Sequence, residues 1–115
     1  MSLKSLASLG RVSKTVEINK ELTITLHTVS SGDQEKVLLQ IPAEGDGTAK
    51  YASIQRATLV YATDEINGQK FDDSNRAELQ EFYSTIQYSL LAQIFEVNLS
   101  CLAEQNTILE DLKKK

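Results

Sequence analysis

The sequence predicts an α+β fold, in which an N-terminal β-hairpin precedes about four α-helices and the C-terminal half is mostly helical. Apolar and polar residues alternate between positions 15 and 28, and apolar residues recur at helical spacing from position 50 onward. The length of 115 residues and the hydrophobic content of 41% are those of one globular domain. We expect a flexible N-terminal arm over residues 1–14, a single domain over 15–112 and a basic tail over 113–115.

The predicted hairpin joins a strand from Thr15 to Ile18 with a second from Glu21 to Thr28, because apolar side chains there occupy even positions only. A polar pair at positions 19 and 20 stands where a two-residue turn would reverse the chain. His27 lies on the polar side of the second strand, so we expect an exposed strand residue rather than a catalytic one.

A short helix from Asp33 to about Gln40 should follow the hairpin. Ser31 can cap its first turn, and Pro42 cannot continue it. The glycine-containing stretch from Pro42 to Ala49 predicts a loop.

A second helix is predicted from Lys50 to Ile66, where apolar residues are too crowded for one narrow stripe and indicate burial around much of the helix. Asn67 and Gly68 end it, since both tolerate the left-handed conformation of a helix end or a tight turn. An apolar helical pattern then continues to Leu112 with no glycine or proline after position 75.

One helix over residues 75–112 would span about 57 Å, which is long for a domain of this size. We therefore expect a break near Ile86 to Ser89, with Ser89 as a second helix cap. The last two helices should form an antiparallel pair or extend outward.

The residues that carry most enzyme chemistry are scarce. A single cysteine excludes an internal disulfide and a cysteine-based metal site, and a single histidine excludes a histidine cluster. Cys101 shares the apolar stripe of Ile94 and Val97, so we expect a small buried hydrophobic residue. No nucleotide-binding glycine motif, calcium loop or serine nucleophile motif is complete. The sequence thus predicts no catalytic, metal or cofactor-binding site, and no enzyme.

Charge is distributed unevenly along the chain. The net charge is −4, which disfavours nucleic acid and anionic membranes as partners. Residues 72–112 carry Arg76 against eight acidic residues, so the second half is strongly acidic. This pattern is typical of a solvated helical face, and a surface that selects basic helical partners is the sharper interpretation.

The order of these elements resembles that of the tail assembly chaperones of long-tailed bacteriophages. The resemblance covers roughly residues 15–112. It rests on the threonine-rich hairpin at positions 21–30, the buried helix that ends in Ile66-Asn67-Gly68-Gln69, and the long helical tail from Ala77. Arg56 and Ala57 match the basic and small residues of the family on the buried helix.

The resemblance implies a non-enzymatic helper that binds the helical tape measure protein in the host bacterial cytoplasm before the tail tube polymerises around it. The tape measure protein and the tail tube protein are the implied partners, with no cofactor. A wide apolar face on the last helix is the candidate binding surface, and the interpretation of that face as intramolecular core leaves only its last three residues for a partner. The candidate partner-binding residues are Leu91, Phe95, Leu102, Ile108, Leu109 and Leu112.

Two other interpretations remain open at this stage. The chain could be a structural tail or baseplate subunit that self-assembles into the virion, with its arm and hairpin edge joining neighbouring subunits by strand addition. A small regulatory adaptor of the host is the third. We also expect a homo-oligomer, because the hairpin has open edges and the final stripe needs cover.

Overall fold

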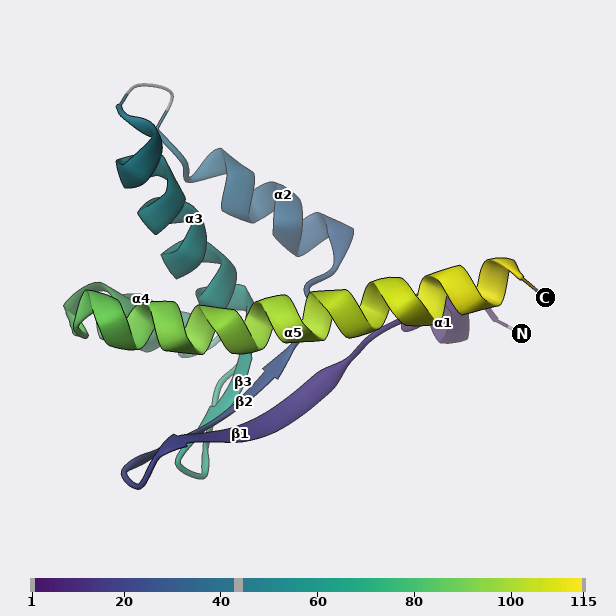
Figure 1. The fold of residues 1–115 in the computed structure, drawn as a ribbon, viewed down its shortest axis with the longest axis horizontal. Coiled ribbons are helices and arrows are strands. Elements are labelled where there is room, and N and C mark those ends of the chain that lie inside the picture. The colour runs from purple at the N-terminus through teal and green to yellow at the C-terminus, as the bar shows by residue number, and fades with distance from the viewer. Residues whose placement is uncertain (1, 43–44, 115) are drawn as a thin grey trace.

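The computed structural model describes residues 2–42 and 45–114, and its elements follow the predicted α+β order (Figure 1). In chain order the elements are α1 (Leu3–Leu6), β1 (Ser13–Asn19), β2 (Leu22–His27), α2 (Ser31–Leu39), α3 (Gly47–Ala62), β3 (Thr63–Ile66), β4 (Gln69–Lys70), α4 (Arg76–Thr85) and α5 (Tyr88–Lys113). The parts of the predicted arm, loop and basic tail at residues 1, 43–44 and 115 lie outside the described residues.

The strands form one antiparallel sheet in the order β1-β2-β3-β4. The predicted hairpin is confirmed: β1 pairs with β2, with Val16 opposite Ile24 and Thr15 opposite Thr25. The hydroxyl groups of those two threonines are 2.8 Å apart. The alternation therefore works as expected, with the even side chains of β2 buried against the helices.

The predicted helix from position 50 to Ile66 is wrong at its C-terminal end, because α3 stops at Ala62 and the chain continues as β3. The Asn-Gly pair makes a tight hairpin turn to β4 rather than a helix end, with Asn67 at φ +49°. The Asn67 side chain accepts a hydrogen bond from the Thr23 amide and donates one to the Glu21 carbonyl, both at 2.8 Å. Pairing with the free edge of β2 thus supplies the backbone partners that another helical turn would have used.

Helix starts differ from prediction by a few residues. Ser30, one residue before the predicted cap, accepts the hydrogen bond from the Asp33 amide and starts α2. α3 begins at Gly47, earlier than predicted, because the Asp46 carboxylate accepts a hydrogen bond from the Ala49 amide at 2.9 Å. The predicted loop is shorter by the same amount.

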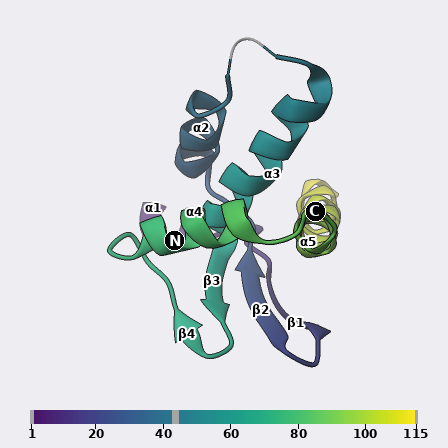
Figure 2. The same ribbon diagram turned by 90° about the vertical axis from the view of Figure 1, so that its left-hand side faces the viewer.

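The long C-terminal helical stretch is broken where expected, since α4 ends at Thr85 and α5 begins at Tyr88. The cap position is Gln87, whose side chain makes no capping hydrogen bond, so Ser89 is not the cap. Figure 2 shows α4 crossing the view while α5 points along it, so the two helices do not form an antiparallel pair. α5 instead extends across the molecule to the end where both termini lie (Figure 1).

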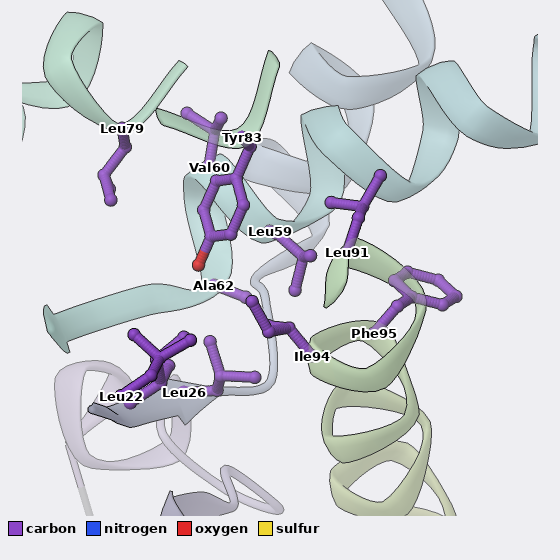
Figure 3. Close-up of a cluster of buried hydrophobic side chains, with 11 residues drawn as sticks. Leu22, Leu26, Leu59, Val60, Ala62, Leu79, Tyr83, Leu91, Ile94 and Phe95 are labelled. Carbon is purple, nitrogen blue, oxygen red and sulfur yellow. The ribbon is translucent and has the colours of Figure 1, made fainter. Parts of the chain in front are cut away.

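The hydrophobic core lies between one face of the sheet and α3, α4 and α5 (Figure 3). β2 supplies the sheet face, and the three helices each supply buried side chains. The core residues are Leu22, Ile24, Leu26, Leu59, Val60, Ala62, Leu79, Tyr83, Leu91, Ile94 and Phe95. This arrangement uses only the first half of α5, which leaves its second half free of the core.

Candidate protein-binding surface

The second half of α5 carries a half-exposed apolar stripe. The last fully buried residue of this helix is Cys101. Beyond it, Ile108, Leu109 and Leu112 are 37%, 37% and 39% exposed. Their i, i+1 and i+4 spacing puts them on one side of the helix. We call these three residues the α5 stripe.

Two of the six candidate partner-binding residues belong to the core, which corrects their assignment. Leu91 is 3% exposed and Phe95 is 6% exposed, and Phe95 also makes an edge-to-face contact with Tyr51 at 6.1 Å between ring centroids. α3 covers both side chains, so they contribute to the hydrophobic core. Leu102 is half-buried. Only the α5 stripe keeps the exposure that binding to a partner requires.

The N-terminal segment runs against this end of α5. Gly10 has φ +83°, and a Cβ atom placed there would lie 3.0 Å from Leu109 Cδ2. The Lys14 ammonium lies 2.9 Å from the Glu104 carboxylate and 3.1 Å from the Ser100 hydroxyl. The hydrogen bond to Glu104 raises the pKa of Lys14. Two separate contacts therefore hold the start of the chain to α5.

Residues 3–9, which we call the leucine arm, precede these contacts and expose three apolar side chains. Leu3, Leu6 and Leu9 are 85%, 43% and 52% exposed. The arm contains α1, whose first turn is capped by the Ser2 hydroxyl accepting a hydrogen bond from the Ser5 amide. The sequence predicted only a flexible arm over residues 1–14 and carried no signal for the contact of Gly10 with α5.

The charges of the two segments are opposite. Between Glu104 and Leu112 the helix carries Glu104, Glu110 and Asp111 and no basic residue. Residues 2–16 carry Lys4, Arg11 and Lys14 and no acidic residue. The contact between Lys14 and Glu104 already joins one member of each set, whereas Glu110 pairs with Lys113 of its own helix at 3.1 Å.

A polar cleft of about 280 Å³ lies apart from this surface, where the sheet meets the loop before α4. His27 is not exposed as predicted, since its side chain is only 14% exposed and its Nδ1 atom lies 2.8 Å from Asp64 Oδ1. The two atoms are close, but the contact does not have the geometry of an aligned hydrogen bond. The sequence offered no signal for this cleft, because its residues come from separate parts of the chain.

The charged groups of the cleft are used internally. The Arg76 guanidinium pairs with Asp73, donates a hydrogen bond to the Val60 carbonyl at 3.1 Å and stacks 4.5 Å from the Tyr61 ring centroid. Hydrogen bonds from Ser74 lower the pKa of Asp72. These contacts fix the loop before α4, which explains the cleft as a structural feature.

The single cysteine and the residue types that bind metals bear on reactivity through their positions in the described ranges. Cys101 is fully buried as predicted, and burial raises the pKa of its thiol, which makes it a poor nucleophile. Within residues 2–42 and 45–114, no three His, Cys, Asp or Glu residues are grouped so that they could hold a metal ion. Over the same ranges, no helix has the length and apolarity needed to cross a membrane.

Comparison with protein-family models, curated proteins and solved structures finds no match to this chain. A functional proposal therefore rests on the residues and the surfaces they form. The most distinctive of these surfaces is the α5 stripe, which Gly10 approaches at Leu109.

Proposed function

We propose that this chain is a non-enzymatic chaperone of bacteriophage tail assembly, which binds the tape measure protein in the host bacterial cytoplasm. The observation that carries the proposal is the α5 stripe, an apolar surface on a helix end rich in acidic residues. The resemblance of the threonine-rich hairpin and the long helical tail to those of the tail assembly chaperones supports the same interpretation and names the client, whereas the helix end at Ile66-Asn67-Gly68 no longer contributes to it.

The chemistry of the α5 stripe suits a helical client. An amphipathic helix docks by placing apolar side chains from successive turns against an apolar strip. The acidic residues Glu104, Glu110 and Asp111 around the α5 stripe favour basic residues beside those apolar ones. A tape measure segment with leucine or isoleucine on one face and lysine or arginine at its borders would satisfy both requirements. Release of this segment would let the tail tube protein polymerise around it.

A structural tail or baseplate subunit is the second candidate, because β1 lies at the edge of the sheet. Within the described part of the chain, β1 pairs with β2 only, which leaves the outer backbone groups of seven residues open to strand addition. In that case the chain would form repeating contacts with its own copies and remain in the virion.

The test is co-expression of the tagged chain with the long helix-rich protein encoded beside it, followed by affinity capture. Leu112→Asp is the test variant, and Leu39→Asp is the matched control, since Leu39 is an exposed helical leucine on α2. Capture of a soluble complex by wild type and Leu39→Asp, with loss in Leu112→Asp, supports the proposal. An insoluble client beside rings or tubes of this chain supports the structural subunit instead.

A further inference from the structure

The leucine arm and the α5 stripe both lie toward the end of the molecule that holds the two termini (Figure 1), but α1 and α5 lie on opposite sides of the view in Figure 2. The contact between Gly10 and Leu109 connects them, and the ion pair between Lys14 and Glu104 lies beside it. Six apolar side chains of these two segments are between 37% and 85% exposed. Two sets of exposed apolar side chains at one end of a small domain are typical of surfaces that take part in protein–protein interfaces.

The leucine arm has too few stabilising contacts to stay ordered by itself. α1 has four residues, which is far below the length at which an isolated helix is stable in water. None of the α1 residues is buried. Leu3 is 85% exposed, so the contacts within one copy leave its apolar surface in solvent. Further cover would have to come from another molecule.

The charges of the leucine arm and of the residues around the α5 stripe indicate which molecule covers the arm. The leucine arm is apolar with one positive charge, Lys4, whereas the α5 stripe is apolar and bordered by Glu104, Glu110 and Asp111 together with Lys113. A two-fold rotation would place the arm of one copy on the α5 stripe of the other, and the reverse contact would form at the same time. Lys4 and Asp111 make no ion pair within the described ranges, so each is available to the opposite charge of a second copy.

We propose that this chain forms a two-fold symmetric homodimer in which the leucine arm of each copy docks on the α5 stripe of the other. The occupant of the stripe is thus a second copy whenever no client is bound. This inference goes beyond the proposed function, since no client takes part in it. It also implies that a client helix and the second copy compete for one surface.

The first test is the mass of the full chain in solution by light scattering and sedimentation, over a wide range of protein concentration. We expect a dimer of twice 12.8 kDa that dissociates on dilution. Leu9→Ser and Leu112→Ser should each raise the dimer dissociation constant by about tenfold or more. The control is Leu39→Ser, which removes a leucine on α2 that is more exposed, at 78%, than either test residue and should leave the constant unchanged.

A charge exchange makes the test specific to the proposed pairing. Lys4→Glu places a negative charge opposite Asp111 of the second copy, and Asp111→Lys places a positive charge opposite Lys4 of the second copy. Each variant alone should dimerise about fivefold more weakly at low salt. An equimolar mixture should recover the wild-type affinity, because the mixed dimer restores opposite charges at both contacts. High salt should remove these differences.

Three results would overturn the proposal. One is a monomer at every concentration. Another is an open-ended polymer that grows with concentration, which a closed two-fold pair cannot form. The third is a dimer that Leu9→Ser and Leu112→Ser leave intact, or a mixture of the charge variants that associates no better than either alone. Client capture with Leu9→Ser separates this proposal from the proposed function, because that variant should weaken the dimer but leaves the α5 stripe unchanged and should still capture the client.

Discussion

Two consecutive hydrogen bonds connect the end of α3 to α4. The loss of unfolding free energy when either is removed can be predicted. The Thr63 hydroxyl donates to the Leu59 carbonyl at 2.7 Å. Because its proton is used there, the Tyr83 hydroxyl must donate to Thr63 Oγ1, which lies 2.6 Å away. Tyr83 is 1% exposed and Thr63 is 4% exposed, so water cannot replace either partner.

Substitutions at Tyr83 and Thr63 should lower the free energy of unfolding by different amounts. Tyr83→Phe removes one hydrogen bond but leaves the Thr63 hydroxyl its carbonyl partner, for a loss of about 1 kcal/mol. Thr63→Val leaves the Tyr83 O–H buried without an acceptor, for a loss of about 2 to 3 kcal/mol. The Leu59 carbonyl is not orphaned, since the Thr63 amide also donates to it.

The double variant should therefore lose less unfolding free energy than the two single variants lose together. With both hydroxyls gone no buried donor is left unpaired, and we expect a loss of about 1 to 2 kcal/mol, hence a coupling energy of about 2 kcal/mol. Urea unfolding of the four proteins at neutral pH measures this cycle. Losses that add to within about 0.5 kcal/mol, or a Thr63→Val loss smaller than that of Tyr83→Phe, would refute the reasoning.

Three further predictions concern the same core and the arm. Burial raises the pKa of Tyr83 from 10.0 to about 12, because the folded state favours the neutral phenol. The protein should therefore lose up to about 2 to 3 kcal/mol of unfolding free energy, fully present below pH 10, as the pH rises from 10 to 12. Urea unfolding across this range should show a weaker loss in Tyr83→Phe, and equal losses would contradict the assignment. Asn98 is 2% exposed and its Nδ2 has no hydrogen-bond partner, so Asn98→Leu should raise the free energy of unfolding by about 1 kcal/mol; a loss in denaturant titration would disprove that. Gly10→Ala should release the arm from Leu109, because alanine is strained at φ +83° and its Cβ would press on that side chain; faster amide exchange over residues 3–12 would reveal it, and unchanged exchange would count against the contact.

The sequence predicted the fold wherever the pattern was local. The β1–β2 hairpin follows from the alternation of side chains such as Ile24 and Leu26, and the break between α4 and α5 follows from length. β3 was missed because its residues continue the crowded pattern of α3. The strand exists through pairing of Ile66 with Ile24 of β2, a contact between distant parts of the sequence. Local pattern cannot separate it from a further helical turn.

The apolar faces of α5 could be predicted from the sequence, because they follow from local spacing, but the residues that cover those faces could not. Helical spacing correctly put Leu91, Phe95 and Leu112 on apolar faces of α5, but periodicity does not say which neighbour covers a face. α3 covers Leu91 and Phe95, whereas Leu112 lies on the part of α5 that extends beyond the core. The approach of Gly10 to Leu109 depends on the path of the arm after β1 is placed, which no spacing in the sequence encodes.

The measurement that tests the central proposal most directly is the amount of this chain at successive stages of particle assembly. If a phage encodes the chain, as proposed, quantitative mass spectrometry would compare tape measure complexes from infected cells before tube formation with purified finished particles of that phage. An assembly chaperone that binds through the α5 stripe should be abundant on the early complexes and absent from the particles. Retention in finished particles at a fixed ratio to the tape measure protein would contradict the chaperone account.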